Sequence, residues 1–218
     1  MGSGMNEKKV EPPRPWDAQL ARRLIMPLVH TRVTPNHLTT VRLLVGVAGI
    51  VFFMPGTYLW SNVGALLFVL SNFLDHTDGE LARVSGKTSR VGHIYDLVSD
   101  ALIHVLLFAA IGFGLSGGPL GPWAVALGAL TGCAVSFIFS MRMVIENRLG
   151  KAGTQLSRVG GFETEDVLYL MPLVTLSNSL QPFLLAAAVG SLAYALWVTG
   201  EFVRSGRAVV AQHEYRQR

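Results

Sequence analysis

Charged residues are scarce in this chain. Asp, Glu, Lys and Arg make up 15% of its 218 residues, whereas hydrophobic residues make up 50%, and the mean hydropathy is +0.42. A soluble domain carries about 25% charged residues, so the shortage argues against a soluble protein and indicates an integral membrane protein. It also excludes a nucleic-acid-binding protein, because the apolar segments leave no room for a basic domain outside the membrane.

The chain holds a single cysteine, and its first residues do not resemble a secretory leader. The one cysteine, Cys133, lies inside an apolar stretch, which excludes a disulfide framework and a cysteine-based metal site. The first 35 residues hold charges and several prolines but no long apolar run, so we expect no cleavable signal peptide. Internal repeats and low-complexity tracts are absent as well, and the chain is interpreted as one domain.

Apolar stretches fill most of the chain. Windows of about 20 predominantly apolar residues, long enough to cross a bilayer core, recur along it. We therefore expect an all-α integral membrane protein with six transmembrane helices. The expected spans lie near 38–55, 57–76, 95–116, 121–144, 165–180 and 182–203. The fifth is short and polar in part, and the second and third are expected to continue as helices beyond the lipid.

Lys and Arg are missing from alternate connections. All 18 of them lie before or at the start of the first span, between the second and third, between the fourth and fifth, or after the sixth. The connections "PGTYLWSN", "SGGPLGP" and "SNSLQP" contain none. The positive-inside rule then places both termini in the cytoplasm. A pI of about 9.5 adds attraction to anionic membrane lipid.

The segment before the first span has helical periodicity. Trp16, Leu20, Leu24 and Ile25 share one face of a helix over 16–30, with Arg22 and Arg23 on the other side. This pattern favours an interfacial helix, with an ordinary amphipathic contact helix as the alternative. The predicted organisation is a cloning scar and disordered N-terminus (1–15), an interfacial helix (16–33), a six-helix domain (34–205) and a cytoplasmic tail (206–218).

Four aspartates interrupt this apolar pattern in "DHTDGELARVSGKTSRVGHIYDLVSD", residues 75–100. Asp75 and Asp78 share one helix face, and so do Asp96 and Asp100 on the next helix. The short connection "RVSGKTSR" makes the helices antiparallel neighbours, so the two faces can meet. Four carboxylates in a low dielectric cannot all stay ionised without cations. Mg²⁺ takes carboxylates together with substrate phosphates, and two metals about 3.5–4 Å apart would clamp a phosphoryl group.

Glycines beside the aspartates support a binding site. Glycine inside a helix costs about 0.5–1 kcal/mol relative to alanine, so Gly79 and Gly92 need a reason. They open space for a nucleotide, with the small Ala82 on the same face and Arg83 available to a phosphate or to an aspartate. Buried ion pairs or a cation path would also use aspartates. A cation transporter, however, would carry polar residues across the bilayer, whereas the deep parts of these helices are apolar apart from His104.

The pattern D-x-x-D-G-x-x-A-R-x8-G-x3-D-x3-D resembles the signature of the CDP-alcohol phosphotransferases, and every fixed position is filled. "TPNHLTTVR" at 34–42 is similar to the family's usual start of the first span. The resemblance implies a homodimeric enzyme that moves a phosphatidyl or phospho-alcohol group from a CDP-activated donor to an alcohol and releases CMP. A non-catalytic relative would be expected to have lost an aspartate, and none is lost.

The same resemblance implies roles for single residues. Asp75, Asp78 and Asp96 match the ligands of Mg²⁺ (with Mn²⁺ as an alternative), and Asp100 matches the general base and a possible metal contact. The positions that match the surroundings of the cytidine diphosphate are Gly79, Ala82, Arg83, Gly92, Asn36 and Thr39. The expected location is the bacterial inner membrane, with the site facing the cytoplasm.

The acceptor and the donor stay open. A basic loop, Arg142, Arg148, Lys151 and Arg158, suits a phosphorylated acceptor such as inositol phosphate or glycerol phosphate, although the positive-inside rule explains it equally. The acidic segment Glu163, Glu165 and Asp166 favours a cationic amino alcohol such as ethanolamine or choline, pairs with the loop or caps a helix. We favour a phosphate-bearing or polyol acceptor, with CDP-diacylglycerol rather than a soluble CDP-alcohol as donor. His76 and His93 are further candidates for substrate contact.

Overall fold

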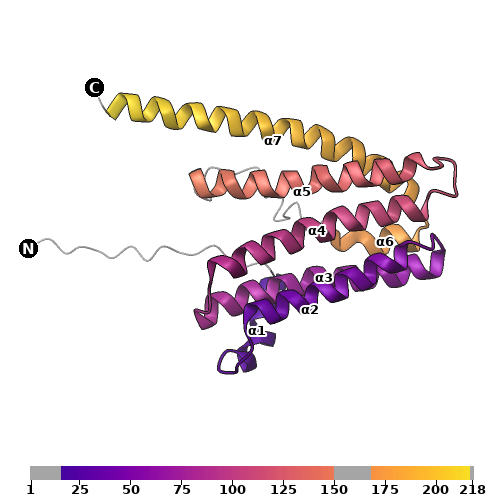
Figure 1. Ribbon diagram of the computed structural model, residues 1–218, viewed down its shortest axis with the longest axis horizontal. Coiled ribbons are helices and arrows are strands. Elements are labelled where there is room, and N and C mark those ends of the chain that lie inside the picture. The colour runs from indigo at the N-terminus through magenta and orange to yellow at the C-terminus, as the bar shows by residue number, and fades with distance from the viewer. Residues whose placement is uncertain (1–15, 150–167, 217–218) are drawn as a thin grey trace, which may run out of the picture.

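The computed structural model describes residues 16–149 and 168–216, and their side chains over 19–145 and 168–204. Every regular element in these ranges is a helix. In chain order they are α1 (Trp16–Ile25), the short 3-10 helix η1 (Met26–Leu28), α2 (Pro35–Phe53), α3 (Tyr58–Ser85), α4 (Arg90–Gly114), α5 (Trp123–Leu149), α6 (Met171–Leu176) and α7 (Leu180–Arg216). The long helices run side by side along one axis, with α1 near one end of the bundle and α6 near the other (Figure 1).

Four helices in the described part are long and apolar enough to cross a membrane. They cover Pro35–Phe53, Arg90–Gly114, Trp123–Ile145 and Leu180–Arg204. An all-helical membrane architecture agrees with the prediction, but six spans are not confirmed. The expected second span corresponds to the first two thirds of α3, which is not one of these four helices. In place of the expected fifth span, the described residues contain a 3-10 turn over 168–170 and the six-residue α6, which together are too short to cross a bilayer.

Local signals explain where the site helices begin and end. Thr34 adopts an extended conformation before α2, with Pro35 at the first helical position, where a missing N–H costs nothing. Helix α3 ends at Gly86, whose φ of 68° is the left-handed conformation that favours glycine. At the start of α4, the Ser89 hydroxyl accepts a hydrogen bond from the Gly92 N–H (2.9 Å). A short turn therefore reverses the chain between α3 and α4. The two helices do not pack side by side as the short connection predicted, because α2 packs against both of them.

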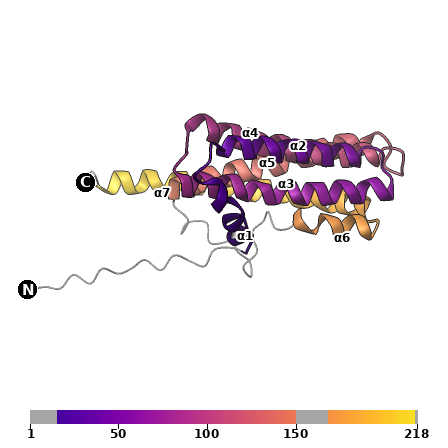
Figure 2. The same cartoon turned by 90° about the horizontal axis from the view of Figure 1, so that it is seen from below.

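A continuous apolar core joins α2, α3 and α4. Its largest fully buried side chains include Phe53, Phe68 and Phe108, and residues of α6 and α7 pack against the same cluster. A smaller cluster of Ile138, Ile145 and Val198 joins α5 to α7. Figure 2 shows α7 running on past the bundle at the end where α3 turns into α4.

Glycines allow α4 and α5 to approach backbone to backbone. A Cβ atom at Gly112 would lie 2.2 Å from the Ala124 carbonyl oxygen, and one at Gly128 would lie 2.1 Å from that of Phe108. One turn further along, a Cβ atom at Gly132 would lie 2.7 Å from the Val105 Cα. Because real Cβ atoms do not come this close to a backbone, each position requires glycine.

Helix α1 is shorter than the predicted interfacial helix and packs against α3. Its buried residues are Ala21 and Ile25, whereas Leu20 and Leu24 are exposed. The exposed leucines leave an apolar edge on this helix, which is the arrangement expected for a helix at a membrane surface.

Candidate functional site

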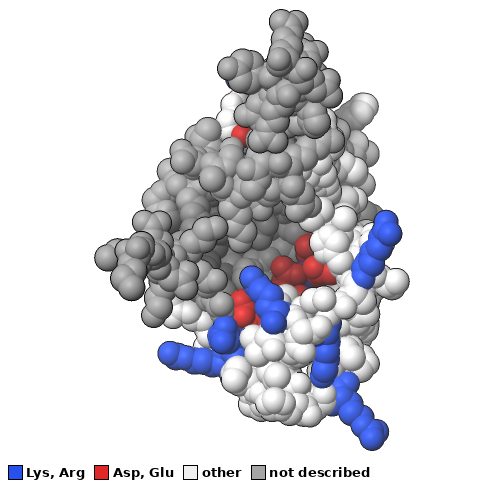
Figure 3. All heavy atoms as spheres, turned by 90° about the vertical axis from the view of Figure 1, so that its left-hand side faces the viewer, with Lys and Arg blue, Asp and Glu red and all other residues white. Residues whose placement is uncertain are grey.

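The aspartates gather in a hollow at the end of the bundle where α3 turns into α4. Figure 3 views this end, with acidic side chains inside the hollow and Lys and Arg side chains spread around it. Carboxylate oxygens of Asp75, Asp78 and Asp96 all lie within 4.8 Å of one another. Asp78 is 4% exposed, whereas the other members of the cluster are partly open. The two helix faces predicted from the spacing therefore do meet.

Arg42 on α2 lies at the centre of the cluster. Its Nη1 donates to Asp75 and, at 2.6 Å, to Asp100. Its Nη2 donates to the Asp96 carboxylate at 3.0 Å. One buried guanidinium thus joins Asp100 to the other aspartates. From the sequence, Arg42 was counted with the positive charge at the first span and ended the "TPNHLTTVR" stretch, but it was given no role in the site, although it lies one helical turn after Thr39.

Thr39 contacts the most buried aspartate. Its hydroxyl donates to Asp78 Oδ2 at 2.7 Å. Burial raises the pKa of the Asp78 carboxyl from 3.8 to about 6, against the lowering effect of this hydrogen bond. Asp78 lies on α3 beyond the apolar stretch 57–76, at the inner wall of the hollow.

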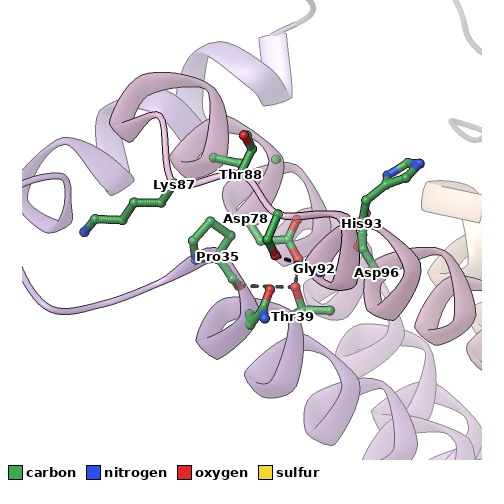
Figure 4. A pocket seen from close by; sticks show the side chains of 12 residues that line it. Pro35, Thr39, Asp78, Lys87, Thr88, Gly92, His93 and Asp96 are labelled. Atoms are coloured by element: carbon green, nitrogen blue, oxygen red, sulfur yellow. Dashed lines mark hydrogen bonds between the residues drawn. The ribbon is translucent and has the colours of Figure 1, made fainter.

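A cavity of about 190 Å³ adjoins the aspartates. Figure 4 shows its lining, with Thr39 and Asp78 pointing toward one another between α2 and α3. Most residues that the family resemblance assigns to the nucleotide line it, namely Asn36, Thr39, Gly79, Ala82 and Gly92. The cavity thus brings together five positions that lie up to 56 residues apart in the chain, and Asp96 of the cluster forms part of its wall.

The two motif glycines face different surroundings. A Cβ atom at Gly79 would meet only the Arg83 Nη2 at 3.6 Å, an ordinary contact, so the space beside it is open. A Cβ atom at Gly92 would lie 2.7 Å from Asn36 Oδ1 and 2.9 Å from Ser89 Oγ. Gly79 therefore leaves room in the cavity, whereas Gly92 lets α2 pack close to the start of α4.

Arg83 lies outside the cavity lining and is 65% exposed at its side chain. Its Nε donates to the Gly79 carbonyl oxygen at 3.2 Å, and its Nη2 lies 3.2 Å from the Glu80 carboxylate. The side chain stays near the site but contacts none of the four aspartates within ion-pair distance.

Lys87 lines the cavity, and sequence reasoning missed it as part of the site. Its Nζ donates to the carbonyl oxygens of Thr31 (2.8 Å) and Val33 (3.1 Å) and lies 3.5 Å from that of Val29. In Figure 4 it points away from Asp78, and so ties the α3–α4 turn to the segment before α2. No local sequence pattern predicts this contact, because it depends on how the α3–α4 turn folds over the segment before α2.

The residues expected at the acceptor are mostly beyond the described side chains. Arg142 on α5 donates to the Tyr194 hydroxyl on α7 and lies 5.8 Å from the centre of that ring; it does not line the aspartate cavity. The Arg148 side chain, Lys151, Arg158 and the acidic segment 163–166 fall outside the described residues. Of the two histidines, His93 lines the cavity, whereas His76 lies on α3 with its Nδ1 3.1 Å from the Asn72 carbonyl oxygen.

An apolar cavity of about 400 Å³ lies between α4, α5 and α7. Phe108, Val135, Phe139 and Phe183 contribute to its wall. Two of these, Phe108 and Phe183, stack with their ring centres 6.1 Å apart. Its lining suits hydrocarbon rather than a charged group.

The donor set of the cluster fits a hard divalent cation. It offers carboxylate oxygens alone, and in the described part of the chain no cysteine or histidine joins it. Oxygen-only sites of this kind suit Mg²⁺, Ca²⁺ or Mn²⁺ rather than Zn²⁺. Three carboxylates within reach of one another form a cluster that could bind such an ion.

Comparison with known proteins points in one direction. The CDP-alcohol phosphatidyltransferase family matches residues 32–200. The archaetidylinositol phosphate synthase of Pyrococcus horikoshii is 28% identical over 187 residues, covering 85% of this chain and 89% of that protein. The CDP-diacylglycerol–glycerol-3-phosphate 3-phosphatidyltransferase of Rickettsia typhi is 36% identical over 69 residues, covering 32% of this chain and 39% of that protein.

A longer relative shares part of its length with this chain. The bifunctional IPC transferase and DIPP synthase of Thermococcus kodakarensis is 29% identical over 110 residues, which is 50% of this chain. The match spans 24% of that protein.

Proposed function

Because the chain belongs to the CDP-alcohol phosphatidyltransferase family, we propose that it transfers a phosphatidyl or phospho-alcohol group from a CDP-activated donor to a small polar alcohol, with release of CMP. The observation that carries the proposal is the aspartate cluster. All four motif aspartates lie around the Arg42 guanidinium, next to a cavity lined by Gly79, Ala82 and Gly92 of the same motif. The family motif includes every aspartate, and the cavity beside them would take the nucleotide.

Asp75, Asp78 and Asp96 would hold the divalent cation, for which Mg²⁺ is our first choice. Such an ion neutralises the charge of a diphosphate when it is bound. The cavity between Gly79 and Gly92 would take the cytidine diphosphate, with the open space beside Gly79 admitting it close to the α3 backbone.

Asp100 would act on the acceptor. The acceptor hydroxyl oxygen forms a bond to the phosphorus that carries the alcohol or lipid of the donor, and the bond from that phosphorus to CMP breaks. The hydroxyl proton passes to the Asp100 carboxylate, which is 39% exposed at its side chain and so can be reached from solution. A base must lie within hydrogen-bond reach of the proton that it takes, and a partly open carboxylate at the rim of the cluster meets that need.

Lipid as donor is supported by the second cavity. The apolar space between α4, α5 and α7 suits an acyl chain, and α4 connects it with the aspartates at its first turns. CDP-diacylglycerol is therefore the proposed donor, and inositol phosphate or glycerol phosphate the proposed acceptor. The archaeal and rickettsial relatives are named for products or acceptors of this phosphate-bearing kind.

We further propose that the protein is a homodimer with its site on the cytoplasmic side. Lys and Arg side chains lie below and to the right of the hollow that holds the aspartates (Figure 3), and positive residues favour the cytoplasmic side. Cross-linking in native membranes tests the dimer, and labelling of a cysteine introduced at Arg90 in inverted vesicles tests the orientation.

The test of the reaction is CMP release by the purified full chain in liposomes with Mg²⁺ and CDP-diacylglycerol. Inositol, inositol phosphate, glycerol phosphate, serine, ethanolamine and choline are offered separately as acceptors. We expect release with a phosphorylated acceptor and loss of release in Asp100→Asn. Glu201→Gln, which removes a carboxylate from α7 outside the cluster, is the matched control and should keep activity.

Three outcomes would change the proposal. Release with ethanolamine or choline alone would replace the phosphorylated acceptor by an amino alcohol. Release only with a soluble CDP-alcohol would replace the lipid donor. Absence of both CMP release and CDP binding would overturn the enzyme assignment.

A further inference from the structure

Arg42 is one of the most deeply buried charged residues in the described part of the chain, at 3% exposure. It comes from α2, whereas the four aspartates come from α3 and α4. The Ser71 hydroxyl on α3 donates to the Arg42 carbonyl oxygen at 2.9 Å, which fixes the height of Arg42 along α3. The guanidinium is therefore held in place from its backbone as well as from its tip.

Its contacts cover the whole cluster. Nη1 bonds to Asp75 and Asp100, and Nη2 bonds to the carboxylate and, at 3.3 Å, to the main-chain oxygen of Asp96. Nε lies 4.0 Å from Asp78 Oδ2 and is buried without a hydrogen-bond partner. The fork of the guanidinium thus binds three aspartates and leaves the fourth to Thr39.

The cluster holds more negative charge than Arg42 can balance. A guanidinium keeps its positive charge in proteins and matches carboxylates with a fork of donors. It supplies one positive charge to four acidic side chains, and the carboxylate oxygens that it engages are ligands of the kind that a divalent cation needs. Arg42 and a cation at Asp75 and Asp96 therefore draw on the same carboxylates.

We propose that Arg42 is a positioning residue that holds the aspartates together before a cation binds and competes with divalent cations for them. This inference rests on the metal site of the proposed function. Arg42 keeps the cluster compact in the metal-free protein and gives up part of its contacts when a cation binds. It thereby weakens cation affinity and stabilises the metal-free protein.

The test measures cation affinity and stability rather than turnover. Full-length wild type, Arg42→Gln and Arg42→Lys are purified in detergent, and Arg23→Gln, which removes an exposed arginine from α1, is the control. Thermal unfolding is followed in EDTA and during a Mg²⁺ titration. Mn²⁺ binding is read directly from the signal of the free ion by electron paramagnetic resonance.

We expect Arg42→Gln to unfold at a lower temperature in EDTA and to bind Mg²⁺ and Mn²⁺ at least about tenfold more tightly, because a unit charge beside partly exposed carboxylates is removed. Arg42→Lys keeps the charge but lacks the fork, so its stability and affinity should fall between the two. Arg23→Gln should match wild type in both measurements.

Equal or weaker cation binding in Arg42→Gln would overturn the inference, because a residue that only supports packing would lower stability without raising affinity. If Arg42→Gln folds only in the presence of Mg²⁺, the inference is supported. If it does not fold in either condition, Arg42→Lys decides, and an affinity equal to that of wild type would refute competition.

The same data separate this inference from the proposed function. Cation binding that tightens in the Arg42 variants, in a protein that never releases CMP, would leave the inference standing and remove the enzyme. CMP release by a wild type whose cation affinity does not depend on Arg42 would do the reverse.

Discussion

Gly79 and Gly92 are the two glycines of the motif, and the structure predicts different effects on the free energy of unfolding when each is replaced by alanine. Gly79 lies inside α3 and lines the cavity, with no atom closer than 3.6 Å to an added Cβ. Alanine is favoured over glycine in a helix interior by about 0.5–1 kcal/mol. Gly79→Ala should therefore raise the free energy of unfolding by about this amount, or the unfolding midpoint by about 1–4 °C.

Gly92→Ala meets resistance that Gly79→Ala does not. The new Cβ would lie 2.9 Å from Ser89 Oγ and 2.7 Å from Asn36 Oδ1, so both side chains must move. Moving the Ser89 hydroxyl breaks its hydrogen bond with the Gly92 N–H, and loss of such an N-cap costs about 0.5–2 kcal/mol. This loss offsets or exceeds the helix gain, so Gly92→Ala should be neutral or destabilised by up to about 1 kcal/mol.

Binding should respond differently from stability. If the nucleotide lies against α3 in the cavity, the methyl group of Gly79→Ala occupies part of its space. CDP affinity should then fall about tenfold or more, the scale of a steric cost of about 1.4 kcal/mol or more, in a protein that is more stable than wild type. Gly200→Ala is the matched control, because this glycine also lies in a helix with nothing within 4 Å of an added Cβ.

The measurements are thermal unfolding in detergent and CDP titration by calorimetry on the same preparations. Gly200→Ala should gain stability and keep its CDP affinity. A Gly79→Ala protein that binds CDP as well as wild type would refute the explanation given for that glycine. Higher stability in Gly92→Ala than in Gly79→Ala would show that the close contact at the start of α4 carries no cost.

Three further changes test other parts of the structure. In Gly128→Ala the methyl group would meet the Phe108 carbonyl oxygen at 2.1 Å, so α4 and α5 must separate. We expect the free energy of unfolding to fall by about 1–3 kcal/mol, measured by thermal unfolding. Gly190→Ala should show no such fall, because an added Cβ there meets nothing within 4 Å. Lys87→Met removes the ammonium that binds the carbonyl groups of the 29–33 segment, so limited proteolysis of that segment should become faster. CDP affinity should become about fivefold weaker, a cost of about 1 kcal/mol. An unchanged rate of proteolysis would contradict this prediction. Because burial raises the pKa of Asp78 to about 6, a proton competes with a cation for this carboxylate below that pH. Mg²⁺ affinity measured at pH 5 should therefore be about tenfold weaker than at pH 7. An Mg²⁺ affinity that does not change with pH would argue against Asp78 as a ligand.

The sequence was informative about the aspartates because their spacing follows helical geometry. Residues three or four apart share a helix face, and the short turn after Gly86 brings the start of α4 back to the end of α3, so the meeting of Asp75 and Asp78 with Asp96 was predictable from local rules. The expectation that α3 and α4 would be packed neighbours was wrong, because α2 packs against both of them. The open space beside Gly79 followed from the same reasoning. These features lie close to one turn between two consecutive helices.

Features that join distant segments could not be predicted in this way. Arg42 lies 33 residues before Asp75 and 58 before Asp100, and no periodic pattern shows which helix will place its positive charge among the acids. The six spans expected from hydropathy are not confirmed, because in the described part of the chain the short helix α6 ends before the polar residues Ser177 and Asn178, and Asn178 has a φ of 54°. Composition identifies an apolar segment, but its length as a helix depends on such local breaks.

The glycine contacts between α4 and α5 also limit how the protein can move. At three successive levels the backbone of one helix touches the other, with the space of a side chain removed. Helices in such contact cannot slide or roll past each other without a collision, so α4 and α5 should behave as one stiff plate. Asp96 and Asp100 ride on this plate, whereas Asp75, Asp78 and Arg42 belong to the α2–α3 pair. Because α2 packs against α4 as well as against α3, any opening of the site would have to part α2 from this plate.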